Sequence, residues 1–341
     1  MRDFVVLACI NGNEARLHWS AINDAEGWTV GTGSSDVQDM PTGGPIQGFI
    51  GGEVGYVMQR TRVTRMNYLP GSELIIQFDE VEGGRGLTAP NSLVRLGQEA
   101  FYLSSDGFYR MDLGGGGARP IGIGKWQRWF LNDLKVGTQA FVLGAISPQN
   151  SAILWPYVSK SNPSTTLPDK VLIYDWSIDE AAIAEFSVQA LSGWLTAGVS
   201  LDGMNPYGTL DELPVSLDSS FWKGGAPIVG IINGDNKLAH LEGPNLAARF
   251  VTADGQRSNR RTLVQGTRVD IDTSSITVEV AARERDSDTV VYGPAESMED
   301  TGIVPAWESG NLARARVKVQ NGATWSYAKG ISTIAADAGS R

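Results

Sequence analysis

The sequence predicts an all-β protein, with a β-propeller-like body followed by a C-terminal β-sandwich-like sheet domain. Three observations support this fold class. Glycine supplies 41 of 341 residues, about 12% against about 7% in ordinary proteins. Short apolar runs recur from end to end with glycine, Asn, Asp or Pro between them, and helical periodicity is nearly absent. The shares of hydrophobic residues, 42%, and charged residues, 19%, are those of a folded chain.

Residues 1–240 form the predicted propeller-like body. Their strand-like runs lie at 4–10, 53–59, 73–78, 99–104, 139–146, 151–158, 170–177 and 227–233. Segment 92–113 predicts three strands joined by turns at Gly97-Gln98 and Asp106-Gly107. The run at 179–186 leaves two structures open, a short helix capped by Asp179 or a further strand.

Aromatic residues recur beside these runs. Trp is coupled to Ser and polar turn residues in 16–28, 170–180 and 323–330. Hairpins followed by bulky aromatic residues are typical of propeller blades, although aromatic core residues in any β-sandwich produce a similar sequence pattern. We expect burial of the strand residue Cys9 and of four tryptophans: Trp19, Trp28, Trp155 and Trp176.

Residues 241–341 form the predicted C-terminal β-rich domain. Long alternating strands occur at 262–271, 275–285 and 312–319, a pattern that suits sheets with one buried face. The charge balance changes at the same place. The first 240 residues hold 16 basic and 25 acidic groups, whereas the last 101 hold 12 and 13.

Residues for catalysis are scarce. Only two histidines occur, His18 and His240, and no metal-binding spacing accompanies them, so we expect no enzyme activity, no metal and no cofactor. The glycine-dense segment 114–124 lacks the features of a phosphate loop and predicts a turn. A net charge of −10 excludes a protein coated with nucleic-acid-binding charge. No apolar run is long enough to predict a membrane-spanning segment.

Two basic segments are candidates for contacts. In 59–68, strand alternation places Arg60 and Arg62 on one face and Arg65 on the other, where Arg65 needs a carboxylate partner such as one from 78–84. Either this is an edge strand protected by charge, or it lines a DNA channel or meets a neighbouring subunit. The second segment holds Arg257, Arg260 and Arg261, in a solvated loop or a contact with a partner chain.

Ordered phrases along the chain carry a family resemblance. They are WSAIND (19–24), the GG and GE pairs within 43–53, RTRVTRM (60–66), RG (85–86), NSLVRLG (91–97), SSDGFYRMD (104–112) and PIG (120–122), and later ILWPYVS (153–159), KVLIYDWS (170–177), the three Leu-Asp phrases of 200–220 and the ending GISTIAADAGSR. With these phrases the chain resembles tailed-phage packaged-DNA stabilisation or tail-hub proteins, which are related in role to the nozzle proteins of short-tailed phages. The likeness is best over residues 16–177.

This resemblance implies a structural virion protein, made in the host cytoplasm and assembled into the tail. It implies a propeller-based subunit in a six-fold ring below the portal and adaptor, which retains packaged DNA and forms the channel for its ejection. The implied partners are further copies of the chain, tail adaptor or portal-side proteins, tail fibre or spike proteins and, transiently, genomic DNA. Members of this family usually carry a further strand-rich segment before the WSAIND phrase. The resemblance therefore implies a propeller that has fewer blades or is completed by another chain. The alternative function is a β-propeller tail protein that binds or hydrolyses glycans.

Overall fold

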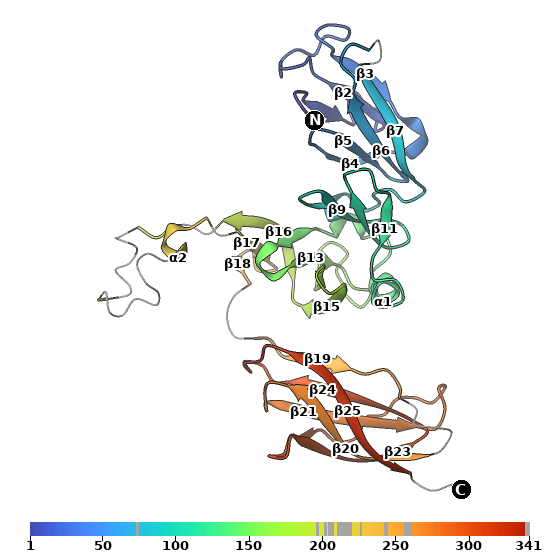
Figure 1. Ribbon diagram of the computed structural model, residues 1–341, viewed down its shortest axis with the longest axis vertical. Helices are drawn as coiled ribbons and strands as arrows, with labels where there is room; N and C mark the ends of the chain where they lie inside the picture. Colours follow the sequence, from blue (N-terminus) through green and yellow to red (C-terminus); the bar gives the residue numbers. More distant parts are fainter. Residues whose placement is uncertain are drawn as a thin grey trace. The chain divides into compact units, whose positions relative to one another are not determined.

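The computed structural model describes residues 1–72, 75–195, 198–200, 203, 208–209, 220–225, 227–241, 245–255 and 261–337. The chain is an all-β protein, which confirms the predicted fold class (Figure 1). The described residues include two α-helices, α1 (Gln127–Asp133) and α2 (Ser220–Lys223). They also include four 3₁₀ turns, at Pro41–Gly43, Pro90–Ser92, Gln139–Phe141 and Pro148–Asn150. The chain folds into two compact units, Met1–Leu241 and Glu242–Arg341.

The N-terminal unit consists of five small antiparallel sheets that follow one another along the chain. The first sheet contains β1 (Val6–Ala8), β2 (Arg16–Trp19) and β3 (Asp36–Asp39). The second contains β4 (Ile46–Ile50), β5 (Gly55–Gln59), β6 (Arg62–Tyr68) and β7 (Ile76–Gly83). The third contains β8 (Val94–Leu96), β9 (Glu99–Leu103), β10 (Phe108–Asp112) and β11 (Ala118–Pro120).

The fourth sheet contains β12 (Ala145–Ser147), β13 (Ala152–Tyr157), β14 (Lys170–Asp175) and β15 (Glu180–Glu185). The fifth contains β16 (Val188–Leu195), β17 (Pro227–Asn233) and β18 (Leu238–His240). In every sheet each strand pairs with its neighbour in sequence, so all five are up-and-down meanders, the unit from which propeller blades are built.

Local sequence explains these meanders. The three strands expected in 92–113 are present as β8, β9 and β10, with turns at the expected places. Gly97 and Gly107 have positive φ angles of 58° and 145°, a backbone conformation that glycine adopts without steric cost. Segment 179–186, which also allowed a helix, contains strand β15 at 180–185, and this strand pairs with β14 along its whole length.

Consecutive sheets pack against each other through separate hydrophobic clusters. One cluster joins the third and fourth sheets and centres on Trp155, whose ring lies 4.3 Å from that of Phe108. Other clusters join the first and second sheets, the second and third, and the fourth and fifth. The sheets are therefore stacked in chain order, and each interior sheet is covered on both faces.

The expectation that four tryptophans are mostly buried holds, whereas the expected burial of Cys9 is wrong. Trp19 and Trp155 are 3% and 0% exposed, and Trp28 and Trp176, which lie outside strands, are partly buried. Cys9 is exposed. Strand β1 ends at Ala8, and the chain turns out of the sheet at Cys9 with a φ of 59°, so the strand alternation that predicted its burial does not reach it.

The C-terminal unit is a β-sandwich of two antiparallel sheets (Figure 1). One sheet has the order β19 (Ala248–Val251), β24 (Leu312–Val319), β21 (Ile276–Arg283) and β22 (Glu296–Ser297). The other has the order β23 (Ile303–Gly310), β20 (Thr262–Ile271) and β25 (Ala328–Asp337). Alternating valines and alanines of both sheets form one core, as the alternation in the sequence predicted.

Candidate interaction surfaces

The arginines of segment 59–68 lie in different local structures. Strand β5 ends at Gln59 and β6 begins at Arg62, so Arg60 lies in the hairpin turn between them and is exposed. The expectation that Arg60 and Arg62 share a strand face is therefore wrong, because strand alternation does not extend into a turn. Arg62 and Arg65 both lie on β6, between β5 and β7.

Two of these arginines are paired within the second sheet. Arg62 contacts Glu80 at 3.0 Å and Arg65 contacts Asp79 at 3.3 Å, so the partner of Arg65 comes from the expected segment 78–84. Asp79 also accepts hydrogen bonds from Gln77 and Asn67, both at 2.7 Å. The bond from Gln77, followed by that from Arg65, holds the pKa of Asp79 below its ordinary value.

Arg60 differs from its two neighbours. It has no ion pair with any residue in the described part of the chain, and its side chain is exposed. Of the three arginines, Arg60 is therefore the one whose charge is available to a partner.

A close backbone contact at Gly86 fixes the turn that carries Arg60. The amide of Leu87 donates to the carbonyl of Gln59 at 2.8 Å, and the amide of Gly84 donates to that of Thr61 at 2.7 Å. Gly86 lies between them, and a Cβ there would stand 2.2 Å from the Gln59 oxygen. Only glycine allows this backbone approach.

Sequence reasoning missed an aromatic seam between the second and third sheets. Tyr102 and Tyr109 stack with ring centroids 5.9 Å apart, and the Arg85 guanidinium lies 5.4 Å from the Tyr109 ring. The Tyr109 hydroxyl donates to Asp106 at 2.6 Å. Burial and then this hydrogen bond raise the pKa of Tyr109 to about 12. No local motif signals the cluster, because its members come from different strands and loops.

The second basic segment is only partly described. Arg261 is exposed and pairs with Glu284 at 3.2 Å. Arg257 and Arg260 lie outside the described residues, so their predicted role in a loop or partner contact stays a prediction.

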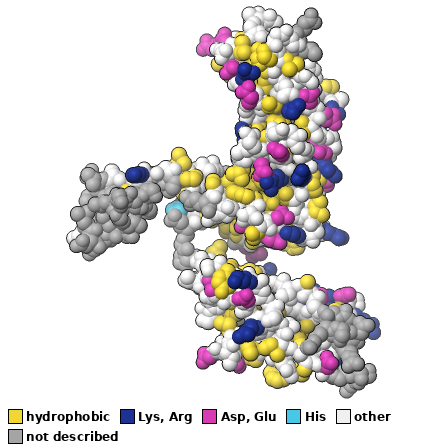
Figure 2. All heavy atoms as spheres, viewed as in Figure 1, with side chains coloured by type: hydrophobic (Ala, Val, Ile, Leu, Met, Phe, Trp, Pro, Cys, Tyr) yellow, Lys and Arg dark blue, Asp and Glu magenta, His cyan; other side chains and the backbone are white. Residues whose placement is uncertain are grey.

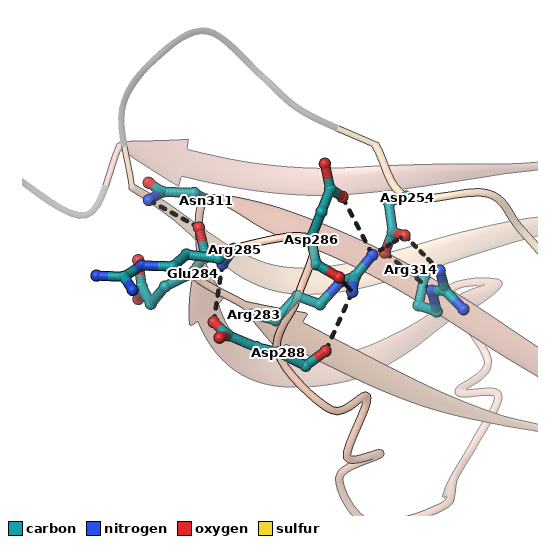
Figure 3. Close-up of polar contacts among 8 residues, drawn as sticks. All are labelled: Asp254, Arg283, Glu284, Arg285, Asp286, Asp288, Asn311 and Arg314. Atoms are coloured by element: carbon teal, nitrogen blue, oxygen red, sulfur yellow. Dashed lines mark hydrogen bonds and ion pairs between the residues drawn. The ribbon is translucent and has the colours of Figure 1, made fainter.

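An ion-pair network in the C-terminal unit was also missed by sequence reasoning (Figure 3). Asp254 accepts from Arg314 at 2.9 Å and from Arg283 at 2.6 Å, which ties the segment after β19 to strands β24 and β21. Asp286 adds a contact with Arg283 at 3.3 Å. Hydrogen bonds, first from Arg314 and then from Arg283, lower the pKa of Asp254 to about 2. The network gives Arg283 and Arg314 a structural role.

The outer face of the first sheet is partly apolar. Leu7, His18 and Val37 form one cross-strand row, with Leu7 46% and Val37 36% exposed. The neighbouring residues Leu17 and Trp19 point to the opposite face, where they join the clusters with the second sheet. The Trp28 indole packs on the His18 ring with centroids 5.1 Å apart, so the loop after β2 covers the middle of this row, whereas Leu7 and Val37 at its two ends stay exposed.

The outer face of the fifth sheet is apolar as well. Trp194 lies across Gly230, where a Cβ would stand 2.0 Å from the indole ring. Register places Ile228 beside Trp194 and Ile232 beside Leu238, which is 70% exposed. The alternate residues of these strands pack on the fourth sheet. The stacked series thus has apolar side chains on both of its terminal faces.

Other features bear on function. Figure 2 shows acidic, basic and hydrophobic side chains interspersed over the visible surface of both units. Among the residues that the structure describes, no group of three or more His, Cys, Asp or Glu side chains is placed to hold a metal ion. No helix in the described ranges is long and apolar enough to cross a membrane.

Comparisons with known proteins give no family for this chain. No protein-family description matches it, and no curated protein matches it. Among solved structures, the chain is similar to an exo-β-1,3-galactanase from Phanerochaete chrysosporium, with 10% sequence identity and a TM-score of 0.20. The match covers 96% of this chain and 80% of the galactanase.

Proposed function

We propose that this chain is a structural virion protein of a phage tail. In this proposal it forms a hub or nozzle ring below the portal and adaptor, retains packaged DNA, and provides the channel for genome ejection. The sequence phrases that resemble tail-hub proteins suggest the role. The observation that carries the proposal further is the stack of five sheets with apolar side chains on both terminal faces.

The terminal faces favour assembly between copies. Each interior sheet of the stack buries apolar side chains on both faces, whereas the first and fifth sheets do so on one face among the described residues. A first-sheet face of one copy set against the fifth-sheet face of the next would repeat the packing within the chain. Head-to-tail contacts of this kind generate rings when the rotation closes.

The charge distribution supports a channel that binds DNA only weakly. Arg62, Arg65 and Arg85 each contact a carboxylate of their own unit, at 3.0, 3.3 and 3.8 Å. The chain carries a net charge of −10. Strong phosphate neutralisation would hold the genome in place, so a channel for ejection needs few free cations.

Substitutions on the terminal faces test the proposal. Leu7→Lys and Leu238→Lys place a charge on already exposed positions, so the fold should persist while the contact between copies is lost. Val136→Lys, at a 94% exposed position that follows α1 and belongs to neither the first nor the fifth sheet, is the matched control. Sedimentation velocity should show concentration-dependent multimers for the wild type and for Val136→Lys, and monomers for the other two.

The same variants separate the tail role from the alternative. Particles carrying Leu7→Lys should lose packaged DNA, and particles carrying Val136→Lys should keep it. A wild-type chain that stays monomeric at all concentrations and releases sugars from host-envelope polysaccharide would favour the glycan-hydrolysing propeller instead.

A further inference from the structure

Trp307 presents a large apolar side chain to solvent at the edge of the C-terminal sandwich. It lies on β23, an edge strand, and is 73% exposed. Exposing an indole to water is unfavourable compared with burying it. Trp is also more frequent in protein interfaces than on the rest of the protein surface. Its neighbours on the strand, Val304 and Ala306, are 1% and 9% exposed and belong to the core.

A β-bulge sets the position of Trp307. On β20, one residue separates Val264 from Gly266, whereas on β23 the paired residues Glu308 and Pro305 are separated by two, Ala306 and Trp307. Bulges bend the strand and re-aim side chains. Pro305 also removes one backbone donor from the strand, which suits an edge position. The local backbone therefore directs the indole outward.

A cavity of about 210 Å³ lies beside the indole. Val278 and Val280 of β21 contribute to its lining from the core side, and Pro294, Pro305 and Trp307 contribute further apolar surface. Pockets for drug-sized ligands run from about 300 Å³ upward, so this cavity suits one side chain or one ring rather than a large ligand.

Two acidic residues, Glu296 and Glu308, also line the cavity. Neither has an ion pair or hydrogen bond with any residue in the described part of the chain. Glu308 is held close to the backbone, because a Cβ on Gly293 would stand 2.5 Å from its Oε1 atom. Gly293 is itself fixed by a 2.9 Å hydrogen bond from its amide to the carbonyl of Val280.

The surrounding sequence does not neutralise these carboxylates. Residues 289–311 contain four acidic side chains, Glu296, Glu299, Asp300 and Glu308, and no Lys or Arg. The cavity therefore combines an exposed indole with two acidic side chains that form no ion pair with a described Lys or Arg. A phosphate backbone would be repelled by this arrangement, and a neutral sugar would gain nothing from the net charge.

We propose that this cavity binds an arginine side chain presented by a partner protein. A guanidinium is attracted to the face of an indole, and Trp is the strongest such partner among the aromatic side chains. The same planar group donates to carboxylates in a fork geometry, so Glu296 and Glu308 supply acceptors on the rim. The apolar lining accommodates the methylene stem of the side chain. This inference does not depend on the proposed tail function.

The test uses the full-length chain and small probes. The probes are N-acetyl-arginine methylamide, its neutral citrulline counterpart and a neutral β-galactose disaccharide. Binding is followed by the ¹H–¹⁵N signal of the Trp307 indole, which Trp307→Phe assigns. The arginine probe should shift this signal with millimolar affinity, and the citrulline probe should bind at least about 10-fold more weakly because it carries no charge.

Variants distinguish binding in the cavity from long-range attraction by the acidic residues around it. The double substitution Glu296→Gln, Glu308→Gln should weaken arginine binding about 10-fold, and raising the salt concentration from 0.05 to 0.5 M should weaken wild-type binding. The control Glu299→Gln, Asp300→Asn removes the same charge from residues that do not line the cavity, and should change affinity less than about 2-fold. Equal binding of citrulline, equal loss in the control, or a response to the disaccharide alone would overturn the proposal.

Discussion

Asp254 shows how much one carboxylate contributes when two arginines converge on it. Its side chain is 16% exposed, and it links the segment after β19 to the ends of β21 and β24. Without this carboxylate, the positively charged side chains of Arg283 and Arg314 would lie close together with no shared acidic partner. The pairing could not be read from the sequence, because Asp254 lies 29 and 60 residues from the two arginines.

Asp254→Asn should destabilise the C-terminal unit at neutral pH. The folded-state pKa of about 2 lies below the ordinary value of 3.8, so the stabilisation is present above pH 4 and is lost as the pH falls toward 2. We expect a loss of about 2 kcal/mol at pH 7 that disappears near pH 2. Urea unfolding at both pH values measures it. Asp286→Asn, at an 89% exposed position of the same network, is the control and should have little effect.

Arg60 and Arg65 should respond differently to the same substitution. Arg65→Ser removes one of three side chains that donate to Asp79, and should cost about 0.5–1 kcal/mol of stability, since both side chains of the ion pair are about one-third exposed. Arg60→Ser should leave the free energy of unfolding unchanged, because no ion pair with a described residue is lost. If Arg60 meets DNA or a neighbouring subunit, its substitution instead alters genome retention in particles. If particles with Arg60→Ser and Arg62→Ser retain their genome and infect at the parental rate, the segment is only a charged hairpin and the proposed contact is wrong.

At the scale of elements, apolar runs and glycine turns predicted most of the strands. The meander of β8, β9 and β10 follows directly from alternation and two turn glycines. Alternation failed at strand ends, where Arg60 and Cys9 lie outside the strands that should have oriented them. Strand ends depend on contacts with distant segments, such as the approach of Gly86 to the β5–β6 turn, and a single sequence does not reveal these.

Gly86→Ala should destabilise the second sheet. A Cβ at this position would lie 2.2 Å from the carbonyl oxygen of Gln59 and 2.5 Å from the amide nitrogen of Arg62, and backbone atoms cannot move aside cheaply. We expect a loss of about 2–4 kcal/mol in thermal or urea unfolding. Gly193→Ala is the control, since a Cβ there meets nothing within 4 Å. Equal stability of the two variants would show that the turn is free to move.

Trp155→Ala should weaken the junction between the third and fourth sheets. The side chain is fully buried, its ring lies 4.3 Å from that of Phe108, and its Nε1 donates to the carbonyl of Ser92 at 2.9 Å. Removing it should cost about 3–5 kcal/mol. Trp28→Ala, at a half-buried loop position, should cost clearly less. A Trp155→Ala chain that unfolds at the wild-type temperature would contradict the stacked-sheet description.

At the scale of the whole molecule, glycine content and strand-like runs predicted an all-β chain, and the change in strand pattern and charge near residue 240 predicted a body followed by a sandwich. The surfaces were less accessible to sequence reasoning. The Trp307 cavity depends on a bulge and on the meeting of β21, β22 and β23, and the terminal faces depend on which side of each sheet is already covered. Both are properties of three-dimensional packing, in which residues distant in sequence share one face.

The most direct test of the tail role is to locate the chain in an intact particle by electron cryo-microscopy. Copies tagged at exposed Val136 should form a ring on the tail axis below the portal and adaptor, around the path of the DNA. Neighbouring copies should meet through the faces that carry Leu7 and Leu238. Absence of the chain from purified particles, or isolated copies away from the tail axis, would contradict the proposed function.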